Sequence, residues 1–168
     1  MHPKVKICGM KNAETKKTAI DHKVDFLGFV FYPDSPRNLT PKQAAKLTKD
    51  IPNHIGKVAV LVNETDQFIE YIKNDFDYFQ LHGNEDVKRI KEIRQKFNKK
   101  IIKVIKVTNE DSAKTYSQYG DEVDMFLFDS PAMEKSAKFD WQILTKIKIT
   151  KPYLVAGSIN INNVDEVL

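Results

Sequence analysis

The sequence is poor in the features that mark stapled, low-complexity or membrane-spanning proteins. Its 168 residues include one cysteine and one tryptophan, and no low-complexity segment or linker interrupts them. No apolar run approaches the ~20 residues that span a bilayer. A lone cysteine cannot form an internal disulfide, which suits a reducing compartment. Met1-His2-Pro3-Lys4 leads directly into a strand-like run, so we expect no signal peptide, no membrane partner and a cytoplasmic location.

The chain also has only a small excess of positive over negative charge. The chain has 27 basic and 23 acidic side chains, which gives a formal net charge of +4. Most of the lysines and arginines stand at helical positions that should face water, such as Lys88, Lys91, Arg94 and Lys96. We therefore predict a solvated helix face and no nucleic-acid partner. The small excess is compatible with an anionic substrate.

Seven short apolar runs recur along the chain, and a charged, helix-like stretch follows each of them. Runs rich in Val, Ile and Phe that alternate with helices are typical of a parallel sheet covered by helices. The runs are Val5–Cys8, Phe26–Phe31, Val58–Asn63, Tyr78–Leu81, Ile101–Val107, Met125–Asp129 and Tyr153–Ala156.

The stretches between the runs carry helix signals. Thr40-Pro41-Lys42-Gln43 combines a capping residue, a proline at the first helical position and a glutamine at the third. Val87, Ile90, Ile93 and Phe97 form one apolar stripe amid charge, which predicts an amphipathic helix. A further helix is expected from about 111 to 119, with Gly120 as its left-handed stop.

Polar side chains end nearly every apolar run, which decides between two architectures. An open doubly wound sheet would place its ligand at one switch point. A ring of polar strand ends instead favours a closed barrel, whose active site lies at the carboxyl ends of the strands. We predict an α/β protein, a TIM (β/α)8-type barrel formed by a single domain over residues 1–168. Since such a barrel normally needs ~200 residues or more, we expect the eighth βα unit to be missing and the barrel to be C-terminally incomplete.

Two residues at strand ends are candidates for acid–base chemistry. Cys8 is either a small buried apolar residue or a thiolate base beside a glycine that lets a ligand approach. Asp129 follows four apolar residues, and burial of an unpaired carboxylate is costly. Asp129 is therefore either a cap or ion-pair residue, or a general acid whose setting raises its pKa.

Other strand ends offer groups that could bind a ligand. Arg37, in a proline-containing loop, suits two-pronged recognition of a carboxylate, although a surface arginine is the competing interpretation. Gln80 and His82 share one strand face because they are two residues apart; a structural histidine is the alternative. The N–H groups at Gly157 and Ser158 could hold a phosphate, although a single glycine also suits an ordinary turn. The histidines show no metal-ligand spacing, so we predict no metal site.

Together these segments resemble phosphoribosylanthranilate isomerase, a barrel enzyme of tryptophan biosynthesis. The resemblance runs in the family's order from Met1 to the end of the chain. The matching pieces are Lys6-Ile7-Cys8-Gly9; Gly28-Phe29-Val30-Phe31 with Ser35-Pro36-Arg37; Val58-Ala59-Val60-Leu61-Val62-Asn63; Gln80-Leu81-His82-Gly83; Phe128-Asp129; Phe139-Asp140-Trp141; and Leu154-Val155-Ala156-Gly157.

The resemblance implies an isomerase that converts N-(5-phosphoribosyl)anthranilate to 1-(2-carboxyphenylamino)-1-deoxyribulose 5-phosphate by an Amadori rearrangement. It implies that Asp129 protonates the sugar ring oxygen and that Cys8 removes the C2′ proton. Arg37 would hold the anthranilate carboxylate, Gln80 and His82 would line the mouth, and Gly157 with Ser158 would bind phosphate. One proton donor and one acceptor suffice, so no cofactor is implied. The expected partner is a phosphorylated small molecule, and the chain is expected to be a monomer or homodimer.

Departures from the family pattern leave alternatives open. The stretch Pro131–Lys138 is shorter than the family's and lacks its glycines, Ser158 replaces a usual glycine, and the family's eighth strand with its phosphate loop is not found. A non-catalytic, phosphate-binding barrel fragment is one alternative. Another barrel enzyme acting on a phosphorylated sugar, such as an indole-forming synthase or an aldolase, is the second; Lys103 and Lys106 are the nearest candidates for a Schiff-base lysine.

Overall fold

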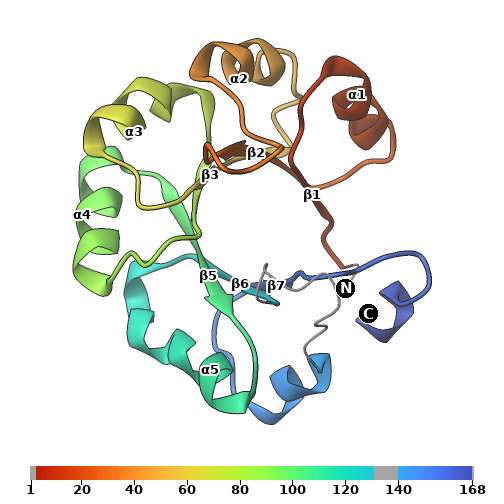
Figure 1. Cartoon of the computed structure of the whole chain (residues 1–168), viewed down its shortest axis with the longest axis vertical. Helices are drawn as coiled ribbons and strands as arrows, with labels where there is room; N and C mark the ends of the chain where they lie inside the picture. Colours follow the sequence, from red (N-terminus) through yellow and green to blue (C-terminus); the bar gives the residue numbers. More distant parts are fainter. Residues whose placement is uncertain (1–2, 131–139, 168) are drawn as a thin grey trace. The chain divides into compact units, whose positions relative to one another are not determined.

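The computed structural model describes residues 3–130 and 140–167, which form two compact units, Met1–Lys100 and Ile101–Leu168. In both units parallel strands alternate with helices (Figure 1). The stretch Pro131–Lys138 and Phe139 lie outside the described residues. Within the described part of the chain, no helix combines the length and apolarity needed to cross a membrane.

The first unit is a parallel sheet with its strands in chain order. β1 pairs with β2, β2 with β3 and β3 with β4. Its elements are β1 (Lys6–Cys8), α1 (Ala13–Asp21), β2 (Phe26–Phe31), α2 (Pro41–Thr48), β3 (Gly56–Leu61), α3 (Asp66–Ile72), the 3-10 helix η1 (Lys73–Asp75), β4 (Tyr78–Leu81) and α4 (Val87–Phe97).

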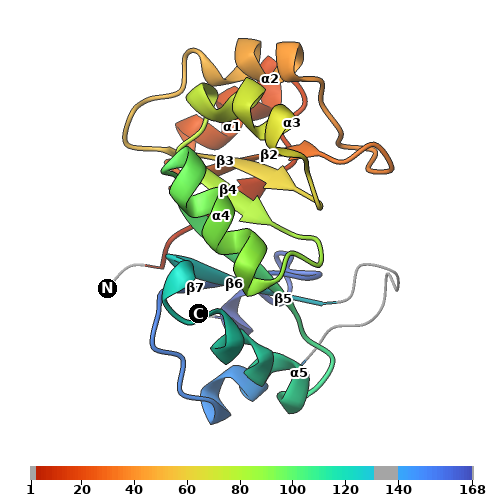
Figure 2. The same cartoon turned by 90° about the vertical axis from the view of Figure 1, so that its left-hand side faces the viewer.

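The helices α1 to α4 lie on one side of this sheet (Figures 1 and 2). Alternate strand residues pack against them: the ring of Phe31 lies 5.4 Å from that of Phe68 on α3, and Phe79 lies 6.2 Å from Phe97 on α4. The rings of Phe31, Phe79 and Phe97 are nearly or completely buried, and Phe68 is half-buried. Because successive strand residues point to opposite faces, the residues between them line the other face of the sheet. Cys8, Gly28 and Gln80 belong to this second set.

The second unit repeats the arrangement with three described strands. β5 pairs with β6, and β6 pairs with β7, again in parallel. Phe126 and Phe128 pack against Tyr116, with ring centroids 5.3 and 6.1 Å apart, so Asp129 lies on the face opposite to these rings. The elements are β5 (Lys100–Lys106), α5 (Glu110–Lys114), η2 (Thr115–Glu122), β6 (Met125–Asp129), η3 (Trp141–Lys146), β7 (Tyr153–Val155) and η4 (Val164–Glu166).

An aspartate just before a strand bonds to both the N–H and the carbonyl of one residue in the preceding strand region, and this occurs three times in the described chain. Asp77 donates its N–H to the Lys57 carbonyl and accepts the Lys57 N–H on Oδ2, both at 2.9 Å. Asp25 does the same with Val5, and Asp124 with Ile101. We call these pairs the aspartate clamps. Each clamp fixes the register of two neighbouring strands at their amino ends.

Most predicted elements are confirmed, with small shifts at their ends. Phe26–Phe31, Tyr78–Leu81 and Met125–Asp129 have the predicted bounds. The structure also confirms the capping box, in which Thr40 and Gln43 bond reciprocally.

The helix expected over 111–119 is wrong in its extent. The α-helix ends at Lys114, and η2 continues as a 3-10 helix. Gly120 has the predicted positive φ of 46°, but its ψ of −125° makes a kink inside η2 instead of a left-handed stop. Tyr116 explains the difference, because its contacts with Phe126 and Phe128 draw this turn onto the sheet.

The aspartate clamps predict a stability cost that depends on one carboxylate oxygen. Replacing Asp77 with alanine should lower the free energy of unfolding by about 1–2 kcal/mol, because the Lys57 N–H loses a charged acceptor. Asp77→Asn keeps one acceptor oxygen and should lose less. Urea unfolding would measure both, with the exposed Asp50→Ala as a control expected within about 0.5 kcal/mol of the unmodified chain. If Asp77→Ala and Asp50→Ala lowered the free energy of unfolding equally, the stabilising role of the Asp77 clamp would be contradicted.

Candidate active site

Cys8 and Arg37 are brought together at the carboxyl ends of β1 and β2. Cys8 is the last residue of β1 and is half-buried. The chain turns at Gly9, whose φ is 92° and whose N–H donates to the Gly28 carbonyl at 2.8 Å. The stem of Arg37 lies against Gly9, where a β-carbon would overlap Arg37 Cδ. Arg37 Nη1 donates to the Cys8 carbonyl at 3.4 Å. Glycine is thus needed at position 9 both for its φ and for the approach of Arg37.

The loop that carries Arg37 is fixed at several points. The Arg37 N–H donates to Ser35 Oγ at 3.2 Å, and Lys11 Nζ donates to the Pro36 carbonyl at 2.6 Å. Asn38 Oδ1 accepts the Tyr32 N–H at 2.9 Å, which closes the loop. The guanidinium itself stays exposed. An exposed guanidinium on a fixed loop suits the binding of a carboxylate.

Gly28 leaves room beside Cys8 for the side chain of Lys6. A β-carbon built on Gly28 would lie 2.8 Å from Cys8 Sγ and 3.0 Å from Lys6 Nζ. Lys6 precedes Cys8 by two residues and shares its strand face. The sequence prediction missed Lys6, although its spacing from Cys8 was a signal that could have found it.

Gln80 lies on the same sheet face as Cys8. It is 3% exposed, and its Oε1 has no hydrogen-bond partner in residues 3–130 and 140–167. Gln80 pairs in register with Val60, two residues toward the carboxyl end from the pair Val58 and Tyr78. A buried carbonyl oxygen without a donor costs stability, so this amide is an acceptor available to a ligand.

His82 follows β4, and the loop after it is held by the end of β3. The His82 N–H donates to the Leu61 carbonyl at 2.8 Å. Asn63, at φ 52°, accepts the Asn84 N–H on Oδ1 and donates its own N–H to Glu85 Oε1, both at 2.8 Å. Glu85 is only 5% exposed. A side chain on Gly83 would overlap Asn63. This network, which the sequence reasoning missed, fixes the position of the loop beside His82.

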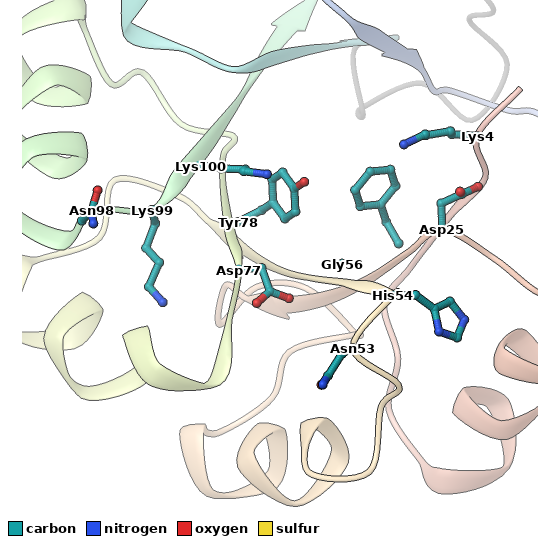
Figure 3. Close-up of a pocket in the computed structure, with 11 residues that line it drawn as sticks. Lys4, Asp25, Asn53, His54, Gly56, Asp77, Tyr78, Asn98, Lys99 and Lys100 are labelled. Atoms are coloured by element: carbon teal, nitrogen blue, oxygen red, sulfur yellow. The ribbon is translucent and has the colours of Figure 1, made fainter. Parts of the chain in front are cut away.

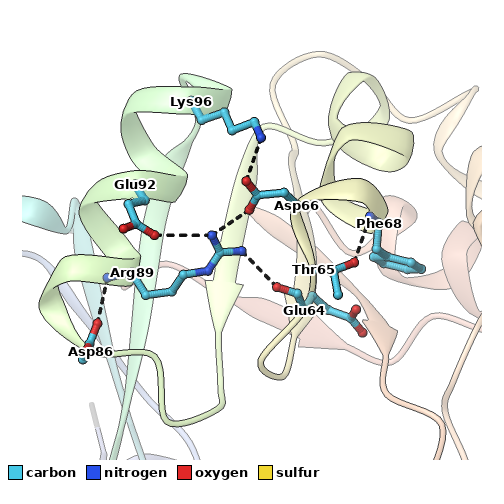
Figure 4. Close-up of polar contacts among 8 residues, drawn as sticks. All are labelled: Glu64, Thr65, Asp66, Phe68, Asp86, Arg89, Glu92 and Lys96. Atoms are coloured by element: carbon cyan, nitrogen blue, oxygen red, sulfur yellow. Dashed lines mark hydrogen bonds and ion pairs between the residues drawn. The ribbon is translucent and has the colours of Figure 1, made fainter.

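An ion-pair cluster on the helix side supports the same loops (Figure 4). Asp66, the first residue of α3, contacts Arg89 Nη1 at 2.6 Å and Lys96 Nζ at 2.7 Å, both on α4. Arg89 also donates to the Glu64 carbonyl at 3.0 Å, one residue after Asn63. The hydrogen bonds from Lys96 and then Arg89 hold the pKa of Asp66 below its ordinary value. Burial raises the pKa of Glu64. The cluster ties the loop after β3 to α4.

In the second unit, Asp129 ends β6 and is half-buried. Its carbonyl accepts the Val107 N–H at 2.8 Å, and its register partner on β5 is Lys106. Ser130, the next residue, is 9% exposed and lies against Gly157, where a β-carbon would overlap Ser130 Oγ. The structure therefore brings the residue after Asp129 together with the turn that follows β7.

The turn after β7 has an unusual backbone. Gly157 and Ser158 have φ values of 95° and 54°. The Ser158 carbonyl accepts hydrogen bonds from the side-chain amides of Asn160 and Asn163, both at 3.0 Å. Within residues 140–167 and the rest of the described chain, the N–H groups of Gly157 and Ser158 donate no hydrogen bond. Successive backbone N–H groups in such a turn form a concavity that attracts anions.

A cavity of about 480 Å³ lies at the other end of the first unit's strands (Figure 3). Its walls include Asp25 and Asp77, whose carboxylates already accept backbone N–H groups in the aspartate clamps. Lys4 and Lys100 lie over the rings of Phe26 and Tyr78, at 5.9 and 5.3 Å. These contacts hold the amino ends of the strands together. The predicted site residues of this unit stand at the carboxyl ends, away from this cavity.

No group of three histidine, cysteine, aspartate or glutamate side chains in residues 3–130 and 140–167 is placed to hold a metal ion. In the first unit, the carboxyl ends of the strands carry a thiol, a guanidinium and an amide. In the second unit, they carry a carboxyl group and backbone N–H groups that have no acceptor among the described residues. Groups of these kinds can move protons and bind anions.

Comparison with known proteins decides the family. The sequence model of N-(5′-phosphoribosyl)anthranilate (PRA) isomerase matches residues 5–168. The chain belongs to the phosphoribosylanthranilate isomerase family. An isomerase of this family from Petrotoga mobilis is 37% identical over 171 residues, which cover 98% of this chain and 80% of that protein. One from Bradyrhizobium diazoefficiens is 35% identical over 173 residues, covering 98% and 78%.

Solved structures of the family agree. A phosphoribosylanthranilate isomerase in complex with reduced 1-(o-carboxyphenylamino)-1-deoxyribulose 5-phosphate has a TM-score of 0.84 and 29% identity, and the alignment covers 99% of this chain and 81% of that chain. Monomers of the dimeric isomerase from Thermotoga maritima give a TM-score of 0.82 and 26% identity, with 99% and 81% covered. The predicted fold class, a TIM-type (β/α)8 barrel, is confirmed by these structures.

The charged cluster of Figure 4 predicts a pH-dependent contribution to stability. Asp66→Ala should lower the free energy of unfolding at pH 7 by about 0.5–1 kcal/mol, because the carboxylate is 37% exposed and partly screened. Because the folded-state pKa lies below the ordinary 3.8, the stabilising charge is present above pH 3.8 and is lost below it. The difference between the two proteins should therefore shrink as the pH falls below 3.8.

Urea unfolding at pH 7 and pH 3 would test this expectation. Glu70→Ala is a matched control on the same helix, since Glu70 pairs with Lys73, only three residues away in the chain and not on α4. It should cost no more than about 0.5 kcal/mol. A loss for Asp66→Ala that stays the same at both pH values would show that packing, and not charge, explains it.

Proposed function

We propose that this chain isomerises N-(5-phosphoribosyl)anthranilate to 1-(2-carboxyphenylamino)-1-deoxyribulose 5-phosphate in tryptophan biosynthesis. The observation that carries the proposal is the family match over residues 5–168. A family structure binds a reduced form of that product, which is an aminodeoxyribulose phosphate. The reaction is an Amadori rearrangement, in which an aldose derivative becomes a ketose without any net oxidation.

The first step needs a proton donor, and we assign it to Asp129. The carboxylic acid gives its proton to the ring oxygen of the ribose while the bond from C1′ to that oxygen breaks. The anthranilate nitrogen supplies its electron pair, so that a C1′=N iminium forms. The position of Asp129 at the end of β6, on the face opposite the helix-packed rings, supports this role.

The second step needs a base, and we assign it to Cys8. The thiolate takes the C2′ proton and becomes a neutral thiol. The electron pair of the C2′–H bond forms the C1′=C2′ double bond, and the iminium π electrons return to nitrogen. The resulting enolamine rearranges to the ketone. The half-buried position of Cys8 at the end of β1, beside a glycine turn, supports this role.

Three further groups would hold the substrate. Arg37 is proposed to bind the anthranilate carboxylate, because its guanidinium is exposed on a loop that hydrogen bonds fix. Gln80 Oε1, which has no partner among the described residues, would accept a hydrogen bond from the substrate, and His82, which follows β4, would line the mouth. The N–H groups of Gly157 and Ser158, which have no acceptor in residues 3–130 and 140–167, would bind the phosphate.

We also propose where the protein is located in the cell and how it assembles. The single cysteine fits a cytoplasmic enzyme that needs no disulfide. The relative from Thermotoga maritima is described as dimeric. We propose a monomer or homodimer, which sedimentation of the purified chain would distinguish.

Removal of either proposed proton-transfer group should stop turnover. Cys8→Ala and Asp129→Ala should each lower kcat by about 10²–10⁴ or more, because each removes one acid–base partner. The fluorescence change on conversion of phosphoribosylanthranilate would measure the rate. Tyr71→Ala, at a position 73% exposed on α3, is the control and should keep full activity.

The unmodified chain must itself turn over substrate in this assay. No turnover by folded protein at any substrate concentration would contradict the proposed function and favour a phosphate-binding role. Near-normal turnover by Cys8→Ala would contradict the role of the thiol alone.

Arg37→Ala should act mainly on binding. Loss of the guanidinium removes a charge-assisted contact with the substrate carboxylate, so KM should rise about tenfold or more while kcat changes less. Arg37→Lys keeps the charge but not the two-pronged geometry, and should restore part of the affinity. A fall in kcat at unchanged KM would rule out the carboxylate role.

A further inference from the structure

The turn that follows β1, residues 8–11, supports the neighbouring loop that carries Arg37. The turn is itself fixed to β2, because the N–H groups of Gly9 and Met10 both donate to the Gly28 carbonyl, at 2.8 and 3.0 Å. Met10 is only 4% exposed, so its side chain anchors the turn in the core. Residues 8–11 therefore form a firm base on which a second loop can rest.

The last residue of this turn, Lys11, holds the peptide group that directly precedes Arg37. The Pro36 carbonyl and the Arg37 N–H belong to that one planar group. Lys11 Nζ donates to the carbonyl at 2.6 Å, and the N–H donates to Ser35 Oγ at 3.2 Å. The bond from Lys11 has a charged donor, which makes it the stronger kind. Because both ends of the group are bonded, its rotation is restricted, and that rotation would swing the side chain of Arg37.

The same turn also fixes the side chain of Arg37. A β-carbon on Gly9 would overlap Arg37 Cδ, so the arginine stem lies directly on the glycine. Arg37 Nη1 donates to the Cys8 carbonyl at 3.4 Å. Residues 8–11 thus hold Arg37 at its backbone, at its stem and at its guanidinium. An arginine that is ordered before a ligand arrives loses less conformational entropy on binding.

We propose that Lys11 is a positioning residue that orders Arg37 for the carboxylate of the substrate. This inference rests on the proposed role of Arg37. Lys11 acts through the Pro36 carbonyl, whereas Arg37 itself makes the contact with the substrate. Since Lys11 affects how well the guanidinium is placed and takes no part in proton transfer, its loss should raise KM more than it lowers kcat.

The kinetic test compares variants of Lys11 in the phosphoribosylanthranilate assay. Lys11→Met keeps the apolar stem and removes the ammonium, so KM should rise about threefold to tenfold while kcat stays within about twofold. Lys11→Arg can donate to the same carbonyl and should restore most of the affinity. Lys17→Met is the matched control, because Lys17 is exposed on α1 and pairs with Asp21 of its own helix. It removes the same charge and should leave KM within about twofold.

A double-mutant cycle separates positioning from direct binding. In a chain that already carries Arg37→Ala, adding Lys11→Met should change KM by less than about twofold, because the group that Lys11 orders is gone. If Lys11 contacted the substrate itself, Lys11→Met would raise KM by the same factor with and without Arg37. That result would overturn the positioning role.

Hydrogen exchange of the Arg37 amide, followed by NMR without substrate, tests the inference independently of turnover. Lys11→Met should speed this exchange about threefold or more, because the peptide group turns away from Ser35 more often. Lys17→Met should not change it. Equal exchange rates in the unmodified chain and in Lys11→Met would overturn the inference, whatever happens to KM. Faster exchange in Lys11→Met, together with a normal KM for Arg37→Ala, would support the ordering effect and overturn the proposed role of Arg37 in binding.

Discussion

Reciprocal hydrogen bonds between an aspartate and the backbone of one residue in the neighbouring strand region hold the described sheets in register. Asp25, Asp77 and Asp124 each use their own N–H and their carboxylate on the same partner residue. A register error of one residue would reverse the face of every side chain that follows. Cys8 then would point toward the helices, and Ile7 would replace it. The chemistry at the carboxyl ends thus depends on bonds made at the amino ends.

The sequence predicts the strands well because they are buried on both faces. Phe26–Phe31 is a continuous apolar run, and four apolar residues precede Asp129 in Met125–Asp129. Such runs can be recognised without knowing which strands pair. The helix beyond Lys114 was less predictable. There the contacts of Tyr116 with two phenylalanines of β6 override local helix preference. Such contacts depend on residues distant in the sequence, which a local pattern does not contain.

The same limit applies to the candidate site. Cys8, Asp129 and Arg37 stand at strand ends, so their positions follow from the strand pattern alone. The contacts around them require the pairing between strands. That Gly28 faces Cys8, or that Ser130 lies beneath Gly157, becomes visible only when the partner strands are known. Glycine at 28 looks like a flexible residue in the sequence, whereas in the sheet it provides volume for two larger neighbours.

Peroxide oxidises a cysteine side chain to a sulfenic acid. The chain has one cysteine, so a sulfenic acid formed at Cys8 could not be trapped as an internal disulfide. Because Cys8 is the proposed base, the same oxidation would remove the group that takes the C2′ proton. The proposed activity would therefore depend on the oxidative state of the surroundings.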